Sequence, residues 1–335
     1  VSTWHPGQSI QSLYKSCVLY GKIMRVGITG AAGYFGRKII ARLEENDSVD
    51  RIIGISRRPW QHSFEKLDYH RLDVRSDTLP KLFASNGVDT VIHLAFMLNP
   101  IHDEREMHDI NVNGTRNVLA AAAEAGVKKV LMSSSTTVYG AWADNPRRLT
   151  EQDPRRGKES RYYYARDKVR LEELCQAWKQ EHPEVIVTTL RPCLVLGPTV
   201  DQFYSRLLNW RMLPLVSGEN PKIQFVHEDD VARAFEHFTV EDIGGVFNIV
   251  GEGAMHWRDI IETAGVRAIK VPRAVLSPLL RLAWWLRLIE VPPAIIDFIQ
   301  YPWVAAGDKA KKAGFIPRYS TRKTLAAFRE AKKNF

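Results

Sequence analysis

The sequence has few cysteines, and their spacing excludes two common uses of that residue. The three thiols belong to Cys17, Cys175 and Cys193, and no two of them form a CxxC pair. A disulfide framework or a zinc cluster needs cysteines in closely spaced groups. The count is instead typical of a protein in a reducing compartment, and we expect a cytoplasmic location.

The sequence also lacks an apolar run long enough to span a membrane. Its most apolar segment, AVLSPLLRLAWWLRLIEVPPAIIDFI, is interrupted by Arg281, Arg287 and Glu290 and broken by Pro292 and Pro293. A spanning helix needs roughly 18 to 20 consecutive apolar residues. The segment therefore predicts amphipathic helices that cover a site or an interface, and no stable membrane anchor.

A strong charge of one sign is missing as well. Lys and Arg total 47, Asp and Glu total 38, and the formal net charge is +9. The cations are scattered along the chain, and no basic low-complexity tail is present. This distribution favours mild attraction to phosphorylated small ligands and predicts no nucleic-acid partner.

The alternation of short apolar runs and helical patterns predicts the fold class. We expect an N-terminal extension at residues 1–23, outside the core fold, because this polar stretch differs in composition from the rest. Between residues 24 and 198, β-branched runs alternate with helical patterns, which predicts βαβ units in a Rossmann-type, doubly wound parallel sheet. The expected strands cover residues 25–29, 51–56, 70–74, 89–95, 129–134 and 185–192, with helices near 38–45, 79–84, 103–125 and around Tyr164.

The remaining residues, 199–335, predict a smaller and mostly helical substrate-binding lobe. Helical patterns near 203–211 and 228–238 are mixed there with short strand patterns, and the last hundred residues are proline-broken. The strand patterns near 223–250 allow the chain to return to the sheet. Ligands of open α/β sheets bind at the carboxyl edge of the strands, where such a lobe would sit.

The segment TGAAGYFG follows the first expected strand and opens a helix. Gly30 permits a tight turn, Gly33 lets backbone N–H groups approach a pyrophosphate, and Gly36 lets the helix pack closely on the strand. Glycines also punctuate ordinary turns. The strand before the motif and the helix after it favour dinucleotide binding, so residues 24–198 are expected to bind NAD(P).

The end of the second expected strand bears on the choice of cofactor. NAD enzymes often carry Asp or Glu here for the ribose 2′-hydroxyl, whereas this chain has Ser56, Arg57 and Arg58. Guanidinium groups bind a 2′-phosphate through charge-assisted hydrogen bonds, although a solvated basic turn is the alternative. The sequence favours NADP(H), with NAD(H) possible. Asp73 ends the third strand, where it could accept a hydrogen bond from the adenine amine or cap the next segment.

The segments VLMSSSTTVYG and SRYYYARDK carry the expected catalytic groups. Tyr164 and Lys168 lie four residues apart and share one face of a helix. A free tyrosine titrates near pH 10, and a neighbouring ammonium favours the phenolate. We therefore expect Lys168 to lower the pKa of Tyr164, and the Ser135 hydroxyl to share a substrate oxygen with the phenol. The alternative is a helix surface with a stray cation.

The ordered motifs TGAAGYFG, LDV, HLA, NVNGT, SSSTTVYG, YYYARDK, RPCLVLGP and FVHEDDVARA resemble the extended short-chain dehydrogenase/reductase superfamily. Within it they resemble the NAD-dependent epimerase/dehydratase family, over about Met24 to Phe235. The resemblance implies hydride transfer at C4 of the nicotinamide, with Tyr164 moving a proton to or from the substrate oxygen, Ser135 beside it, and Lys168 holding the nicotinamide ribose. It implies pyrophosphate contacts from Gly30, Gly33, Tyr34, Phe35 and Gly36, adenine contacts from Asp73 and Val74, and contacts to the nicotinamide half from Leu94, Ala95, Phe96 and Pro192.

Two departures from the family pattern concern the substrate. Sugar-nucleotide members commonly carry Asn where this chain has Leu194, and many carry Arg where it has Ile223. Both changes remove polar contacts to the diphosphate of a sugar nucleotide. Lys222 could compensate, but its ammonium is a point charge, whereas the arginine guanidinium binds a phosphate in a bidentate way. The sequence therefore favours an oxidoreductase for a less polar secondary alcohol or ketone over a nucleotide-sugar epimerase or dehydratase. A non-catalytic cofactor sensor is the third hypothesis, which the Tyr/Lys pair disfavours.

Three further features have competing interpretations. The segments with Trp284, Trp285 and Trp303 suggest an apolar roof over the substrate, or an aromatic packed core. The run His227 to Asp230 invites a metal interpretation, but consecutive acidic residues that open a helix more often cap it, and we expect no metal. Relatives pair through a four-helix interface, so the helices near 103–125 and 164–180 predict a homodimer.

Overall fold

The structure is a computed structural model that describes residues 23–99, 101 and 103–333. The predicted extension at residues 1–23 lies outside the described residues except for Ile23, and Cys17 lies outside them too. The described chain enters the first strand of the sheet directly after Ile23. The extension therefore stays a prediction.

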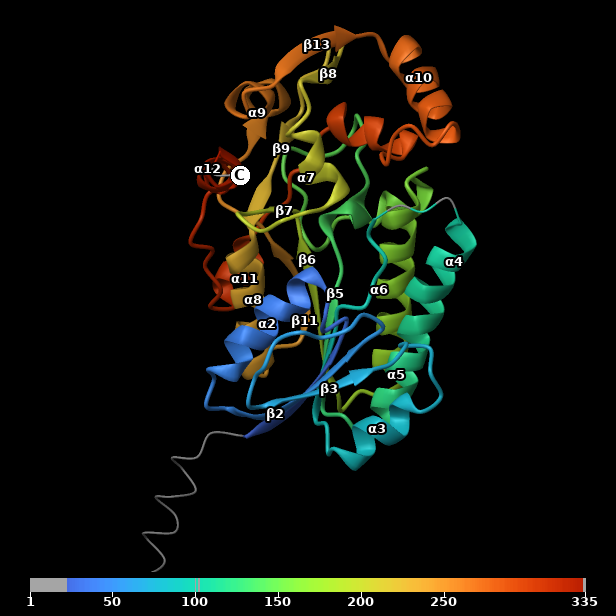
Figure 1. The fold of residues 1–335 in the computed structure, drawn as a ribbon, viewed down its shortest axis with the longest axis vertical. Helices are drawn as coiled ribbons and strands as arrows, with labels where there is room; N and C mark the ends of the chain where they lie inside the picture. The colour runs from blue at the N-terminus through green and yellow to red at the C-terminus, as the bar shows by residue number, and fades with distance from the viewer. Residues whose placement is uncertain (1–22, 100, 102, 334–335) are drawn as a thin grey trace, which may run out of the picture.

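A seven-stranded parallel sheet lies in the lower half of the molecule as Figure 1 shows it. The strand order is β11-β6-β5-β4-β1-β2-β3. The strands are β1 (Met24–Thr29), β2 (Val49–Ser56), β3 (Leu67–Arg71), β4 (Thr90–His93), β5 (Lys129–Ser133), β6 (Ile186–Pro192) and β11 (Gly245–Ile249). The order reverses between β1 and β4, and in such sheets the ligand crevice lies at the carboxyl ends of the strands at that point.

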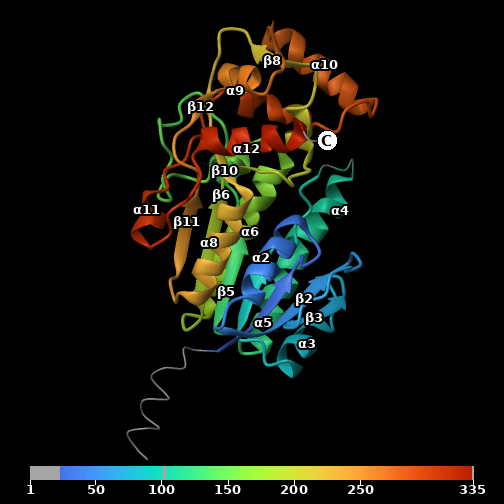
Figure 2. The same cartoon turned by 60° about the vertical axis from the view of Figure 1, so that its left-hand side comes forward.

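Helices cover both faces of this sheet, as the two views in Figures 1 and 2 show. One face carries α2 (Tyr34–Glu44) and α8 (Glu228–Val240), and the other carries α3 (Leu79–Ser85), α5 (Gly114–Glu124) and α6 (Tyr163–Glu181). Successive strand residues point to opposite faces, so Ile52 packs in the first layer and Ile53 in the second. The predicted α/β, doubly wound fold is confirmed.

The helix expected at residues 103–125 contains an irregular turn. It consists of α4 (Glu104–His108), a π-helical segment η1 (Asp109–Asn113) and α5. Asp103 caps it by accepting hydrogen bonds from the backbone N–H groups of Arg105 and Glu106, at 3.1 and 3.0 Å. A π-helical turn often marks a functional position, and here it turns the Asn111 side chain inward.

The third strand begins and ends earlier than expected, at 67–71 instead of 70–74. The backbone N–H of Leu72 still donates to the Ser56 carbonyl at 3.1 Å. The Asp73 carboxylate then accepts from the backbone N–H of Arg75 at 2.9 Å, and this turn ends the strand. Asp73 and Val74 therefore lie in a loop at the carboxyl edge of the sheet.

The C-terminal part contains more strand than expected. Three short ladders pair β10 (Phe225–His227) with β7 (Leu194–Leu196), β12 (Met255–His256) with β9 (Lys222–Ile223), and β13 (Arg267–Val271) with β8 (Met212–Val216). The helices are α7 (Phe203–Leu207), α9 (Trp257–Thr263), α10 (Arg273–Trp285), η4 (Pro293–Ile299), α11 (Asp308–Lys312) and α12 (Thr321–Lys333). Pro214 inside β8 hides that ladder from sequence patterns, because proline disfavours strand assignment. The division of the chain at residue 198 stays a prediction, since α8 and β11 belong to the sheet layers.

Candidate functional site

The glycine turn after β1 has a geometry that requires glycine at two positions. Gly30 adopts a φ of 74°, and a Cβ there would lie 2.7 Å from the backbone nitrogen of Ala95. A Cβ on Gly36 would overlap the carbonyl oxygen of Ala31, so α2 packs directly on the turn. Gly33 is the N-cap of α2, and its N–H donates to the Gly30 carbonyl at 2.8 Å. The amino end of α2 thus opens at the carboxyl end of β1, where helix N–H groups attract anions.

Ser135 and Tyr164 line the same cavity. Ser135 follows β5 and is the N-cap of the short helix η2 (Thr136–Tyr139), where its hydroxyl accepts from the backbone N–H of Thr137 at 3.2 Å. Tyr164 lies in the first turn of α6 and is half-buried. The structure therefore brings the two predicted hydroxyl groups together.

Lys168 lies one helical turn beyond Tyr164 and is buried, with 2% of its surface exposed. Its Nζ donates to the Ser133 carbonyl at 2.6 Å and lies 3.5 Å from the centroid of the Phe96 ring. The centroid of the Tyr164 ring is farther away, at 5.6 Å. The ammonium is therefore held by a strand-end carbonyl and an aromatic face.

The ionisation of this pair differs from the expectation. Burial raises the pKa of Tyr164, against the effect of a hydrogen bond with Ser135. Burial also lowers the pKa of Lys168 to about 7, although the neighbouring carboxylates of Asp167 and Glu172 act in the opposite direction. The net pKa of Tyr164 is therefore raised and not lowered, because desolvation of the phenolate dominates. The contribution of Lys168 to this pKa stays a prediction.

Two buried networks hold the catalytic segments, and the motif analysis assigned no role to either. Asn111 accepts from the backbone N–H of Met97 at 2.7 Å and donates to Asp167 at 3.0 Å. Glu172 accepts from the Ser134 hydroxyl at 2.5 Å and from two nitrogens of Arg191 at 2.8 and 2.6 Å. Asn111 and Asp167 of the first network lie in the NVNGT and YYYARDK motifs, and Arg191 of the second opens the RPCLVLGP motif. No spacing pairs Asn111 with Asp167 or Arg191 with Glu172, so pattern reasoning could not find either network.

The loop after β4 carries the residues expected at the nicotinamide half. Leu94 donates its N–H to the Thr29 carbonyl at 3.1 Å, and the N–H of Ala95 donates to the Thr29 hydroxyl at 3.4 Å. The Phe96 ring meets the Tyr164 ring edge-on, with centroids 5.4 Å apart. Pro192 ends β6 and lines the cavity with Tyr164. Phe96 and Pro192 therefore lie beside the predicted catalytic pair, and Leu94 and Ala95 lie beside the end of β1.

The residues expected at the adenine half lie at the ends of β2 and β3. The N–H of Ala31 donates to the Ile55 carbonyl at 3.1 Å, which places the glycine turn beside Ser56. The Arg57 guanidinium is exposed and lies 3.7 Å from the Asp73 carboxylate. Arg75 binds the same carboxylate at 3.0 and 2.8 Å and lowers the pKa of Asp73. The Arg58 side chain is also exposed, and its backbone N–H lies 3.4 Å from the Ser56 hydroxyl.

The cavity at Tyr164 has a mostly apolar wall. Leu194 and Ile223, the two departures from the family pattern, both line it, and so does Trp303. Its other apolar lining residues include Phe35, Leu98, Phe203, Leu207, Phe225, Trp257, Ile295, Phe298 and Ile299. Trp285 is 74% exposed and does not belong to the lining, so its predicted place in the roof is wrong. Tyr34 does not line the cavity, but its ring packs against Phe35 with centroids 5.1 Å apart.

A second, more polar cavity of about 640 Å³ lies beside α6, between that helix and the strands β6 and β11. Its lining includes Glu151, Arg155, Lys179 and Arg191. No catalytic or cofactor residue expected from the sequence contributes to it. We therefore place the candidate site at the apolar cavity.

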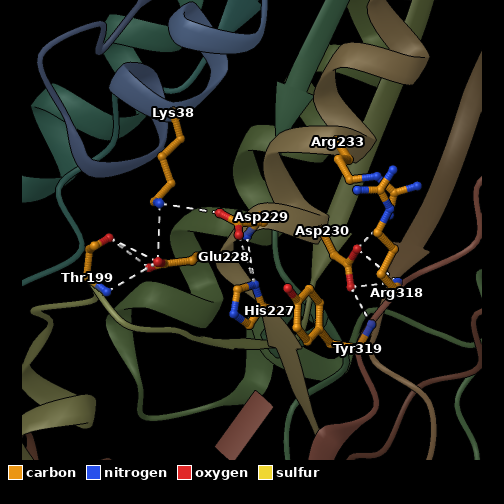
Figure 3. Close-up of polar contacts among 9 residues, drawn as sticks. All are labelled: Lys38, Thr199, His227, Glu228, Asp229, Asp230, Arg233, Arg318 and Tyr319. Atoms are coloured by element: carbon orange, nitrogen blue, oxygen red, sulfur yellow. Dashed lines mark hydrogen bonds and ion pairs between the residues drawn. The ribbon is translucent and has the colours of Figure 1, made fainter. Parts of the chain in front are cut away.

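The residues of the run His227 to Asp230 make different contacts, and Lys38 contacts both Glu228 and Asp229, as Figure 3 shows. His227 caps α8, because its Nδ1 accepts from the backbone N–H of Asp229 at 3.2 Å. Glu228 lies 3.2 Å from Nζ of Lys38 on α2 and accepts from the N–H and hydroxyl of Thr199. Asp230 accepts from the backbone N–H groups of Arg318 and Tyr319 and from the Arg233 side chain. Over the described residues, no group of three or more His, Cys, Asp or Glu side chains could hold a metal.

Comparisons with known proteins agree with this architecture. Residues 26–250 match the model of the NAD dependent epimerase/dehydratase family. An uncharacterized protein of Mycobacterium tuberculosis is 28% identical over 260 residues, which cover 76% of this chain and 68% of that protein. The structure of MoeE5 in complex with UDP-glucuronic acid and NAD has a TM-score of 0.71 at 24% identity, and that of the Thermus thermophilus UDP-glucose 4-epimerase in complex with NAD has a TM-score of 0.73 at 19%. Both structural alignments cover 92% of this chain and 99% of the other, and at these identities they establish the fold alone.

Proposed function

The chain belongs to the NAD dependent epimerase/dehydratase family, and from this premise we propose that it is an NAD(P)-dependent oxidoreductase for an apolar secondary alcohol or ketone. One observation carries the proposal: Ser135 and Tyr164 open into a cavity where Leu194 and Ile223 belong to an apolar wall. An apolar wall excludes water and leaves a substrate oxygen few polar partners besides these two hydroxyls. A diphosphate would lose its usual contacts there.

The residues of the described chain fit a dinucleotide cofactor. A Cβ at Gly30 or Gly36 would overlap neighbouring backbone, so only glycine keeps the turn tight, and the amino end of α2 offers N–H groups to a pyrophosphate. In the proposed assignment Gly30, Gly33, Tyr34, Phe35 and Gly36 bind the pyrophosphate. Asp73 and Val74 contact the adenine, and Leu94, Ala95, Phe96 and Pro192 enclose the nicotinamide half. The bound nicotinamide supplies the hydride acceptor or donor at C4.

Tyr164, Ser135 and Lys168 have different roles in the proposed proton transfer. The raised pKa of Tyr164 keeps its phenol protonated at neutral pH, which suits proton donation to the oxygen of a ketone under reduction. The Ser135 hydroxyl would orient that oxygen, because it lines the same cavity as the phenol. Lys168 would hold the nicotinamide ribose, and its protonated form would favour the phenolate in the reverse reaction.

A Tyr164→Phe variant tests the assignment. The change removes one oxygen from a half-buried ring and leaves its packing against Phe96. We expect the turnover rate to fall by about 10²- to 10⁴-fold, the range for loss of a general acid or base, while cofactor binding is unchanged. Tyr163→Phe is the matched control, because its hydroxyl donates to the Leu98 carbonyl and not to Ser135. Equal turnover by Tyr164→Phe and wild type would remove the proposed role.

The second candidate is a nucleotide-sugar epimerase or dehydratase that retains its cofactor. The observation in its favour is that structural relatives are bound to UDP-sugars and NAD. It predicts tightly held cofactor and turnover without net change in nicotinamide absorbance. Ready exchange of cofactor by the purified protein would count against it.

We propose a preference for NADP(H), with NAD(H) as the alternative. The support is the pair of exposed side chains Arg57 and Arg58 beside Ser56 at the end of β2. The Asp73 carboxylate 3.7 Å from Arg57 and the NAD bound to relatives favour NAD(H). Fluorescence titration separates the two: Arg57→Ala with Arg58→Ala should weaken NADP(H) binding at least about tenfold, or 1.4 kcal/mol, and leave NAD(H) binding unchanged.

We also propose a homodimer formed through α5 and α6. Both helices lie on the same face of the sheet, and each has an exposed side away from it. Light scattering in solution would test this interface.

A reducing, cytoplasmic location is part of the proposal, because the described cysteines, Cys175 and Cys193, are buried free thiols.

A further inference from the structure

Helix α10 exposes a continuous apolar face. Val275, Leu279 and Leu282 are 48%, 55% and 53% exposed, and Trp285 is 74% exposed. Their spacing of three or four residues places them on one side of the helix. The chain after the helix adds Leu286 and Leu288, which are 48% and 72% exposed. An apolar patch of this kind marks an interaction surface.

The charged side chains from β13 to the end of α10 and the two residues after it are all cations, and the first carboxylate beyond them, Glu290, pairs with Arg206. No acidic residue occurs between Thr263 and Ile289, whereas five cations do. Arg273 forms an ion pair with Asp297 at 2.7 Å. The other four cations are exposed and pair with no carboxylate among the described residues; they are Arg267, Lys270, Arg281 and Arg287. Arg281 and Arg287 lie among the exposed apolar residues of α10 and the chain after it, and Arg267 and Lys270 lie on the preceding strand β13. A helix with Trp and Leu on one side and such cations beside them is complementary to an anionic lipid surface.

The inner side of α10 is coupled to the apolar cavity. Leu276 packs with Ile296 of η4, and Arg273 is hydrogen-bonded to Gln300 just after η4. The same segment η4 contributes Ile295, Phe298 and Ile299 to the cavity wall. The short helix η4 therefore contacts the inner side of α10 and also forms part of the cavity wall. Figures 1 and 2 place α10 at the end of the molecule opposite β2 and β3, where no other element covers it.

We propose that the outer face of α10, with Leu286 and Leu288, docks on an anionic lipid surface. In the docked enzyme, α10 would lie in the plane of the membrane–water interface. No helix among the described residues is long and apolar enough to cross a membrane, and the 13 residues of α10 extend about 20 Å. An apolar substrate dissolved in the lipid would then enter the cavity past η4. This entry route rests on the proposed function, but the docking itself does not.

A second copy of the chain is a poorer occupant of this face. A twofold interface brings the same surface of both copies together. Arg281 and Arg287 would then face their own counterparts, and like charges across an interface repel each other. An anionic lipid surface neutralises these charges, and each Lys or Arg near such a surface contributes about 1 kcal/mol.

Sedimentation with lipid vesicles tests the proposal. We expect the full chain to bind vesicles of phosphatidylcholine and phosphatidylglycerol at a ratio of about 3:1 at least about tenfold more strongly than pure phosphatidylcholine, because the anionic lipid attracts the cations. Salt should weaken the binding, because it screens exposed charges. Leu282→Ser with Trp285→Ser should lower partitioning by about tenfold or more. Arg281→Glu with Arg287→Glu should abolish the preference for anionic lipid.

The matched control is Ile316→Ser, because Ile316 is 63% exposed and lies outside this face. Its vesicle binding should equal that of wild type. Cofactor affinity and circular dichroism should be unchanged in all variants, since every substituted side chain is exposed. Equal vesicle binding by wild type and both double variants would overturn the proposal. So would a change from dimer to monomer in Leu282→Ser/Trp285→Ser without loss of vesicle binding, which would assign the face to a second copy. Because the assay needs neither cofactor nor turnover, its failure would leave the proposed reaction untouched.

Discussion

One buried carboxylate, that of Glu172, joins α6 to β6 and to the end of β5, and its removal should be costly. The side chains of Glu172 and Arg191 are each 3% exposed, and two hydrogen bonds of 2.8 and 2.6 Å join them. Glu172 also accepts from the hydroxyl of Ser134, the neighbour of Ser135. Glu172→Gln keeps the shape of the side chain but leaves the guanidinium buried without its counter-charge. Breaking a buried pair in this way costs about 3–5 kcal/mol, a large part of the roughly 5–15 kcal/mol that stabilises a domain.

Urea unfolding followed by circular dichroism measures this loss. The matched control is Glu173→Gln, one residue along, where the carboxylate pairs with Arg170 on the helix surface at 3.0 Å. That exposed pair should contribute no more than about 0.5 kcal/mol. Replacing both members, as Glu172→Gln with Arg191→Met, should recover part of the stability because no charge then remains buried. Equal destabilisation by Glu172→Gln and Glu173→Gln would refute the reasoning.

Two further predictions concern the glycine turn and a core histidine. Gly36→Ala should abolish cofactor binding and destabilise the fold by about 1–3 kcal/mol, because its Cβ would overlap the Ala31 carbonyl. Gly244→Ala is the control, because a Cβ there would make only ordinary contacts. Equal cofactor titrations for the two variants would contradict this prediction. His93 is buried between the hydroxyls of Thr29 and Thr115, and burial lowers its pKa to about 3. Between pH 3 and about 6.5 the imidazole of His93 is protonated in the unfolded chain but neutral in the folded one. The contribution of His93 to the free energy of unfolding is therefore fully present above pH 6.5 and is lost as the pH falls. The stability of wild type should therefore fall more steeply below pH 6.5 than that of His93→Asn, and parallel urea midpoints for the two proteins across that range would contradict the assignment.

The features that could be predicted from the sequence are local ones. The glycine turn needs only the strand before it, the helix after it and glycines at fixed spacing, and the family match over residues 26–250 confirms the predicted family. The shared helix face of Tyr164 and Lys168 follows from helix geometry alone. The parallel sheet follows from alternating strand and helix patterns, because each buried strand is apolar on both faces.

The features that could not be predicted depend on contacts between distant segments. Phe96 reaches Lys168 from the loop after β4, 72 positions earlier in the chain, and no local pattern reports that contact or the burial that sets the pKa of Lys168. The exposure of Trp285 depends on which side of α10 packs on η4. The helix around it is apolar on more than one side, so its sequence does not reveal that choice.

The absorbance of the nicotinamide during turnover tests the central claim most directly. The purified protein would be given NADP(H) or NAD(H) with a series of apolar ketones and secondary alcohols, and in parallel with UDP- and dTDP-sugars. We expect a net change of absorbance with the apolar series that rises with substrate hydrophobicity, because Leu194 and Ile223 line the cavity at Tyr164. Turnover of the nucleotide sugars without a net absorbance change, and none of the apolar series, would contradict the account.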